Sequence, residues 1–299
     1  MDKSGLLDSG AMVSLPSPEI TSKLKVMLPE NPFHIKGTEA ERIASKLGIS
    51  KYQLMIERIE IARPYAVTPV SNFNVGSCAM GLSGDFYLGV NLEFGGDNLD
   101  QTVHSEQCVS CNAMEHGEEG LAVLAVSSAP CGYCRQFLNE MACAGNLKVM
   151  IPEKPVCSLA ELLPHSFGPK DLGIEAGMPM AFEKAVFLEK NGDALVETAL
   201  SEANKTYAPY SHCNAAVAIE LKDGRSVSGR YYENAAFNPS LSPMQAALIM
   251  AVTGGYKWTD IKRGVLVERA DNVITQVPAA SALFKAIAPQ AEFSVQFGR

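Results

Sequence analysis

The hydrophobic pattern divides the chain into a helical start and two later stretches of strands and helices. Between residues 17 and 63 apolar side chains recur at helical spacing, with Leu54 and Ile61 on the same face of one predicted helix. Thr38 is predicted as the N-cap of the helix before it. From about residue 71 the spacing changes, and short apolar runs between turn residues predict strands. We expect the helical region to pack against the module that follows it.

The stretch after residue 71 predicts the order β-β-α-β-α-β. Two strands are joined by a short turn at residues 82–84, and a helix follows that ends at Gly117. A strand, a second helix that starts near Pro130 and a last strand complete the pattern. The predicted fold class is therefore α/β, a mixed β-sheet flanked by helices.

The same pattern restarts after a segment rich in proline and glycine. Residues 71–94 align without a gap with residues 211–234 at a constant offset of 140, with five identities that include two turn glycines. This self-similarity predicts an internal duplication. We predict an N-terminal tail and helical region, a first module, a crossing segment and a degenerate second module, at residues 1–63, 64–151, 152–190 and 191–299.

Candidate chemistry is concentrated in the first module, in the segments "TVHSEQCVSC" and "PCGYC". Two zinc sites can be built from them. A catalytic site would use His104 with the cysteines of the second segment and leave Glu106 free to move protons. A closed structural site would use two Cys-x2-Cys pairs at the spacing of a zinc ribbon. The ligands of that closed site are Cys108, Cys111, Cys131 and Cys134.

The local sequence favours the catalytic arrangement. Pro130 presets a helix start, so Cys131 and Cys134 fall in the first turn and share a face, where the helix dipole favours thiolates. His104 begins the preceding helix, and both helix starts are expected at the same edge of the sheet. Three protein ligands leave one tetrahedral position for water, whose pKa zinc lowers towards about 7. The other cysteine pair lies inside a predicted helix without glycine.

The second module lacks this set of groups. The positions aligned with the imidazole, the carboxylate and the two thiols are Ser242, Met244, Ala279 and Ala282. The loss of all four together indicates that His104, Glu106, Cys131 and Cys134 form one unit.

Composition and charge narrow the class of substrate. The chain has 299 residues, 47% of them hydrophobic, and a net charge of −8. No long basic stripe is present to neutralise the phosphates of a nucleic acid, so we expect a small substrate. The pattern of residues predicts neither a secretory signal nor an apolar run long enough to span a membrane. Eight cysteines without a signal favour a reducing compartment, and we expect the protein in the cytosol.

The order His-x-Glu followed by Pro-Cys-x-x-Cys is the signature of zinc-dependent nucleobase deaminases. The chain resembles the cytidine deaminases of nucleoside salvage, in their long form with a degenerate second module. The motifs that carry this resemblance are "SNFNVG", "NLEF", "TVHSEQ", "PCGYCRQF", "FGPKDL" and "ENAAFNP". The resemblance implies hydrolysis of cytidine and 2′-deoxycytidine to uridine and 2′-deoxyuridine, by a homodimer with one zinc ion per subunit.

The resemblance also implies roles for single residues. The metal ligands would be His104, Cys131 and Cys134, with Glu106 as the group that moves protons. Asn91 and Glu93 would hydrogen-bond the ribose hydroxyl, and their alternation on a predicted strand points both side chains to one face.

Further contacts with the substrate are implied at three aromatic or small residues. Phe73 would stack on the pyrimidine, Phe167 would close the pocket from the partner subunit, and Ala235 would line it.

Arg135 has two interpretations from the sequence alone. It either hydrogen-bonds a zinc thiolate or forms a surface salt bridge.

Overall fold

The computed structural model describes residues 7–175, 177–179, 186–188 and 192–299. The first six residues of the predicted tail and part of the predicted crossing segment lie outside this range. The chain separates into two compact units. The first comprises Met1–Leu92 and Val103–Ser166, and the second comprises Glu93–Thr102 and Phe167–Arg299. The segment Glu93–Thr102 therefore leaves the first module and belongs to the second unit.

The predicted helical start is confirmed. Its helices are α1 (Pro18–Lys25), α2 (Gly37–Leu47) and α3 (Lys51–Ala62), followed by the 3-10 turn η1 (Arg63–Tyr65). Ser50 caps α3, since its side chain accepts the backbone N–H of Gln53. Leu54 is fully buried and Ile61 nearly so.

The predicted N-cap of α2 is wrong. The helix begins at Gly37 with Lys36 as N-cap, so Thr38 lies inside the helix. The reason is a tertiary contact. The carboxylate Oδ1 of Asp85, far along the chain, accepts the N–H of Gly37 at 2.9 Å and so caps the start of the helix.

The first unit contains a mixed six-stranded sheet in the order β1-β3-β2-β4-β5-β6. Only β4 and β5 pair in parallel, and the other neighbours are antiparallel. The strands are β1 (His34–Ile35), β2 (Gly76–Gly81), β3 (Phe86–Val90), β4 (Leu121–Val126), β5 (Lys148–Met150) and β6 (Cys157–Ser158). Its further helical elements are α4 (Ser105–Glu115), α5 (Gly132–Asn139), η3 (Ala144–Asn146) and α6 (Leu159–Leu162).

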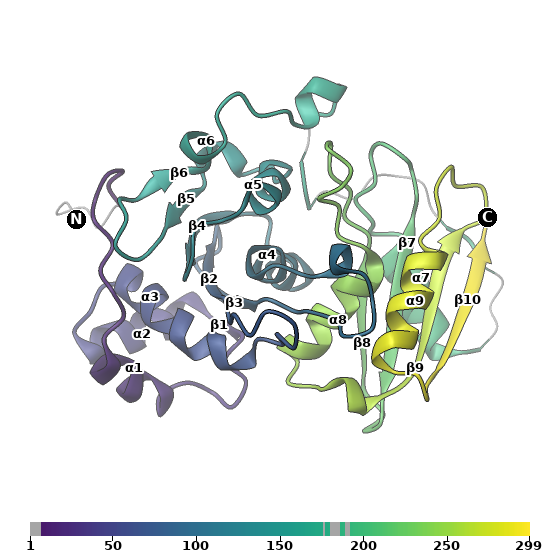
Figure 1. Cartoon of the computed structure of the whole chain (residues 1–299), viewed down its shortest axis with the longest axis horizontal. Coiled ribbons are helices and arrows are strands. Elements are labelled where there is room, and N and C mark those ends of the chain that lie inside the picture. The colour runs from purple at the N-terminus through teal and green to yellow at the C-terminus, as the bar shows by residue number, and fades with distance from the viewer. Residues whose placement is uncertain (1–6, 176, 180–185, 189–191) are drawn as a thin grey trace. The chain divides into compact units, whose positions relative to one another are not determined.

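Helices cover both faces of this sheet, as Figure 1 shows for α3 and α4. Neighbouring residues of β2 mark the two faces, because successive side chains of a strand point in opposite directions. A Cβ on Gly76 would meet the carbonyl oxygen of Ile59 in α3 at 2.7 Å. The hydroxyl of Ser77, next along β2, donates to the carbonyl of Ser105 in α4 at 3.0 Å.

The second unit repeats the pattern around a four-stranded sheet in the order β10-β9-β7-β8. Its strands are β7 (Ala215–Leu221), β8 (Ser226–Arg230), β9 (Ile261–Arg269) and β10 (Glu292–Gly298). Its helices are α7 (Ala194–Ala203), α8 (Pro243–Thr253) and α9 (Val277–Ile287), with the short helices η2 (Leu99–Gln101), η4 (Pro169–Leu172) and η5 (Trp258–Asp260). The predicted duplication of the mixed sheet is confirmed.

Backbone details recur at the offset seen in the sequence. Asn72 and His212 both have a positive φ, at 54° and 57°. The turn residues Gly84 and Gly224 have φ values of 88° and 87°. These four positions lie in pairs 140 residues apart, so the alignment reflects the same local geometry in both modules.

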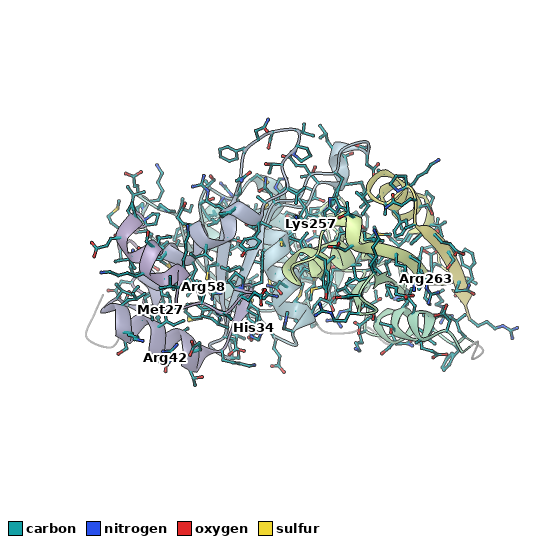
Figure 2. All side chains as sticks on the ribbon, turned by 90° about the horizontal axis from the view of Figure 1, so that it is seen from below. Met27, His34, Arg42, Arg58, Lys257 and Arg263 are labelled. Carbon is teal, nitrogen blue, oxygen red and sulfur yellow. The ribbon has the colours of Figure 1, made fainter. Side chains whose placement is uncertain are left out.

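Ion pairs tie helices to strands within the second unit. Arg263 on β9, labelled in Figure 2, forms a bidentate pair with Asp193, the N-cap of α7. The two distances are 2.6 and 2.9 Å. Its Nε also donates to Glu220 on β7 at 2.6 Å. The bond from Arg263 lowers the pKa of Asp193 to about 2.

Among the described residues, no helix is long and apolar enough to cross a membrane.

Candidate metal centre

The first part of the centre lies at the start of α4. His104 is the N-cap of this helix, and its backbone N–H donates to Oε1 of Gln107 at 3.1 Å. This bond fixes the direction in which the chain enters the helix. Glu106 falls in the first turn and is 4% exposed.

The second part lies at the start of α5. Cys131 is the N-cap and Cys134 is the third residue of the helix, so both thiols belong to the helix start predicted from Pro130. Cys131 is exposed and Cys134 is buried. The centre therefore has one open side, towards Cys131.

Three donor atoms from the two helix starts form a triangle. Nδ1 of His104 lies 3.2 Å from Sγ of Cys134 and 3.4 Å from Sγ of Cys131. The two sulfurs are 3.5 Å apart. The ligands of a tetrahedral zinc ion with Zn–S and Zn–N bonds of ordinary length are separated by roughly 3.5–3.8 Å. One imidazole and two thiols at this spacing fit zinc in both geometry and chemistry.

A hydrogen bond between the two thiols moves their pKa values in opposite directions. The bond from Cys134 lowers the pKa of the Cys131 thiol to about 4. The same bond raises the pKa of Cys134, which is also buried. Cys131 therefore loses its proton readily, whereas Cys134 does not. The positive charge of a divalent cation bound between the sulfurs would favour deprotonation of Cys134 as well.

Glu106 lies against this cluster. Burial raises the pKa of its carboxyl group, while the neighbouring imidazole of His104 and the thiol of Cys134 act in the opposite direction. A buried carboxyl group next to three metal-type donors is placed to exchange protons with a molecule bound there.

The closed four-cysteine site predicted as the alternative is not formed. Within the part of the chain that the structure describes, the one group of three or more metal-type side chains is His104, Cys131 and Cys134. Cys108 and Cys111 are fully buried inside α4. Burial raises the pKa of Cys108 to about 12, as expected for a thiol that fills a core.

Sequence reasoning missed the contacts that hold α4 on the sheet. The hydroxyl of Ser105 lies 2.7 Å from that of Ser77 on β2 and 3.0 Å from the carbonyl of Gly89 on β3. A Cβ on Gly89 would lie 2.4 Å from the backbone nitrogen of Val109, so only glycine permits this approach. The glycine repeated at positions 89 and 229 of the internal alignment was the sequence signal for this contact. Gly229 makes the same close contact with α8 in the second module.

Two of the predicted substrate contacts lie together in the first unit. Asn91 Oδ1 accepts the N–H of Val75 at 2.9 Å, and its Nδ2 donates to the carbonyl of Phe73 at 2.9 Å. The side chain of Phe73 is 58% exposed. Asn91 therefore holds the segment that presents this aromatic ring to solvent.

The other predicted substrate contacts belong to the second unit. Glu93 and Ala235 are buried and Phe167 is exposed. Their roles at the substrate stay predictions.

Arg135 makes contacts that neither interpretation of the sequence included. Its Nε donates to the carbonyl of Pro130 and its Nη1 to that of Leu162, both at 2.8 Å. The guanidinium thus fastens the residue before Cys131 to the end of α6. Tyr133 was also not predicted, and its ring centroid lies 5.8 Å from that of His104.

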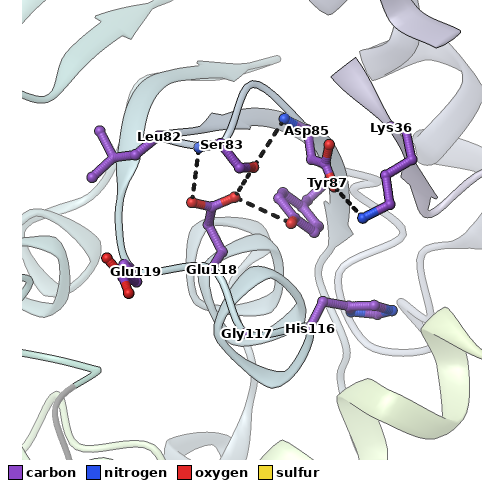
Figure 3. Close-up of a pocket in the computed structure, with 9 residues that line it drawn as sticks. All are labelled: Lys36, Leu82, Ser83, Asp85, Tyr87, His116, Gly117, Glu118 and Glu119. Atoms are coloured by element: carbon purple, nitrogen blue, oxygen red, sulfur yellow. Dashed lines mark hydrogen bonds and ion pairs between the residues drawn. The ribbon is translucent and has the colours of Figure 1, made fainter. Parts of the chain in front are cut away.

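A cavity of about 430 Å³ lies at the C-terminal end of α4, around His116, Glu118 and Tyr87 (Figure 3). Its buried carboxylate is satisfied within the protein. Glu118 accepts hydrogen bonds from the backbone and hydroxyl of Ser83 and from the hydroxyl of Tyr87. Asp85 in the same cavity accepts from Lys36, His34 and the backbone of α2. These bonds tie the N-terminal helices to the sheet.

Comparisons with known proteins identify a family. Residues 50–150 match a family model described as the cytidine and deoxycytidylate deaminase zinc-binding region, and residues 159–281 match a second model with the same description. Together the two matches cover more than half of the chain.

Solved structures similar to this chain include two cytidine deaminases. The one from Mycobacterium tuberculosis is 30% identical with a TM-score of 0.36, over 39% of this chain and 97% of that one. The one from Burkholderia pseudomallei is 29% identical with a TM-score of 0.35, over 38% and 97%. The family assignment rests on the two family models.

Proposed function

The chain belongs to the cytidine and deoxycytidylate deaminase family and is a zinc-binding hydrolytic deaminase, and on this premise we propose its substrates, ligands and proton path. The substrates are cytidine and 2′-deoxycytidine, which are converted to uridine and 2′-deoxyuridine with release of ammonia, in nucleoside salvage in the cytosol. The observation that carries the proposal is the triangle of His104, Cys131 and Cys134 with Glu106 against it.

The three donors at the starts of α4 and α5 would hold the zinc ion. When bound there, zinc supplies a Lewis acid that lowers the pKa of a water molecule towards about 7. The exposed side of the triangle, at Cys131, leaves room for water and substrate. Arg135 and Gln107 keep the two helix starts in place through their bonds to Pro130 and His104.

Glu106 is the proposed proton carrier, and its position supports this role. It takes a proton from water as the water oxygen adds to C4 of the pyrimidine, and it delivers that proton to N3. It then transfers the second proton of the water to the exocyclic amino group, which leaves as ammonia while the C4 carbonyl forms. The overall reaction consumes one water and releases one ammonia, so Glu106 ends each cycle as it began.

Asn91 and Phe73 of the first unit would take part in orienting the substrate. Asn91 uses one N–H and one oxygen lone pair of its carboxamide to bind the segment that carries Phe73. The second N–H and the second lone pair would be free to bind a ribose hydroxyl. Phe73 offers an exposed ring for stacking on the base. The proposed contacts of Glu93, Phe167 and Ala235 rest on the motifs "NLEF", "FGPKDL" and "ENAAFNP".

A homodimer is proposed on the same resemblance, with Phe167 closing the pocket of the partner subunit. A native mass of twice 32.1 kDa is expected. A monomeric mass with full activity would contradict both the dimer and the role of Phe167.

Replacement of Glu106 by Gln tests the reaction. Glu106→Gln should retain zinc and its melting temperature but lose deamination by a factor of about 10²–10⁴, read from the fall in ultraviolet absorbance of cytidine. Glu119→Gln makes the same chemical change at an exposed position and should match the wild type. Normal turnover by Glu106→Gln would reject the proton role. A zinc-loaded wild type that deaminates single-stranded DNA and not cytidine would reject the substrate class.

A further inference from the structure

Residues 93–102 connect two elements of the first module, but they pack with the second. The segment is closed at its base by Leu92 and Val103, which are fully buried and exchange both backbone hydrogen bonds at 2.9 Å. Asn91 directly precedes this base and His104 directly follows it. A ribose contact and a metal ligand of the proposed site therefore flank the two ends of one short segment.

The body of the segment is held by residues of the second module. The side-chain amide of Gln245 donates to the carbonyl oxygen of Gln101 at 2.8 Å. The ring of Phe94 lies 5.9 Å from that of Trp258 between the centroids. Phe94 is 5% exposed, so this ring is part of the packing of the second unit.

Gln245 has two separate tasks. Its Oε1 accepts the N–H of Ser242 at 2.8 Å and completes the capping box of α8, as Gln107 does for His104 in α4. Its Nε2 makes the bond to Gln101. Gln245 is 3% exposed, so little water can reach its amide to replace this bond if it is lost.

We propose that the second module, which has lost the metal-binding groups, positions the catalytic centre by holding residues 93–102. Gln245 and Trp258 are positioning residues in this role. They hold residues 93–102 in place. The backbone pairing of Leu92 with Val103 then fixes the two ends of the segment, and with them the neighbouring residues Asn91 and His104. The inference rests on the proposed function for Asn91 and His104, and it assigns a task to a module without its own chemistry.

The variant Gln245→Glu separates the two tasks. A carboxylate still accepts the N–H of Ser242, since Glu is as good as Gln in a capping box. It cannot donate to Gln101 and repels its carbonyl oxygen. Gln290→Glu is the matched control, because it adds the same charge to the same unit at an exposed position. Phe94→Leu removes the aromatic contact without touching α8 and serves if Gln245→Glu fails to fold.

Three measurements test the proposal on zinc-loaded, full-length protein. Trp258 is the only tryptophan of the chain, so its fluorescence reports the environment of the segment. For Gln245→Glu we expect an emission shift to longer wavelength. Zinc loss to a chelator should be about three- to tenfold faster, and KM for cytidine should rise by a similar factor while kcat changes by less than about twofold. Phe94→Leu should show the same pattern, and Gln290→Glu should match the wild type.

Two results would overturn the proposal. In the first, the emission shifts but zinc loss and KM stay at wild-type values, so the segment is held without positioning the centre. In the second, no property changes, so the bond to Gln101 holds nothing. Zinc loss is measured without substrate. A wild type that binds zinc but does not deaminate cytidine would therefore reject the proposed substrate and leave this test intact.

Discussion

Nδ1 of His104 lies 3.2 Å from Sγ of Cys134, although 30 positions separate the two residues in the chain. The contact forms because the starts of α4 and α5 lie close together: His104 is the N-cap of α4, and Cys134 is in the first turn of α5. Both partners are thus fixed by helix starts, which are rigid. The same positive helix ends stabilise the thiolates that zinc requires.

The two cysteine pairs should differ in their effect on zinc. We expect the double variant Cys108→Ala, Cys111→Ala to retain about one zinc ion per chain, since these thiols fill the interior of α4. Cys131→Ala should lose it, because two donors remain. Elemental analysis of the purified proteins measures both. Zinc loss by the double variant, with its circular dichroism unchanged, would restore the four-cysteine site.

The approach of α4 to the sheet should depend on Gly89. In Gly89→Ala the new Cβ meets backbone atoms of α4 at 2.4 and 2.5 Å, so the helix must move. We expect a loss of about 1–3 kcal/mol in the free energy of unfolding, and a fall in activity because His104 and Glu106 move with the helix. Urea unfolding and the cytidine assay measure these effects. Gly145→Ala is the control, since its Cβ would have no atom within 4 Å.

A wild-type stability for Gly89→Ala would mean that α4 packs further from β3 than the structure places it. Activity lost without any change in stability would show instead that the helix shifts at no cost. Either result would contradict the role of this glycine.

Much of the fold follows from local patterns. The order of strands and helices in both modules comes from hydrophobic spacing, and Gly84 and Gly224 mark tight turns where only a positive φ fits. The three proposed metal ligands are predictable for the same reason, since the structure places each of them in the N-cap or first turn of a helix. Their spacing in the chain also identifies the chemistry of the site.

Contacts between distant segments are not predictable in this way. Thr38 has the local sequence of an N-cap, but Asp85 supplies an acceptor for Gly37 and moves the start of the helix. Nothing in residues 93–102 indicates that they pack with Gln245. In both cases the decisive partner comes from another part of the chain, where local propensity carries no information.

The pair between Asp193 and Arg263 should make the second unit sensitive to acid. The pKa of Asp193 is lowered from 3.8 to about 2 by the bond from Arg263, so the pair stabilises the folded state above the unfolded pKa. This contribution is lost as pH falls from 3.8 towards 2. We therefore expect Asp193→Asn to be less stable than the wild type at about pH 6, with a smaller difference at about pH 3.

Urea unfolding of both proteins at the two pH values measures this difference. Asp223→Asn is the control, because Asp223 pairs with an Arg225 side chain that is 74% exposed, and exposed pairs contribute little. A difference between Asp193→Asn and the wild type that stays constant with pH would show that the ionised pair does not contribute.

Ser105, between the proposed metal ligand His104 and Glu106, should affect stability more than catalysis. Its hydroxyl is buried and shares hydrogen bonds with Ser77 and the carbonyl of Gly89. Ser105→Ala removes these bonds but leaves the backbone of α4 on the sheet, where Gly89 sets the distance. We expect a loss of about 1 kcal/mol in the free energy of unfolding and a kcat within about twofold of the wild type.

The control for Ser105→Ala is Ser110→Ala in the same helix, whose hydroxyl bonds only to the carbonyl of Glu106 at 2.8 Å among the contacts described. It should cost less, because that carbonyl keeps its place in the helix ladder. A large fall in kcat for Ser105→Ala with unchanged zinc content would show that the serine hydroxyl orients Glu106 directly. In that case the hydrogen bonds to Ser77 and Gly89 would belong to the catalytic centre and not only to its support.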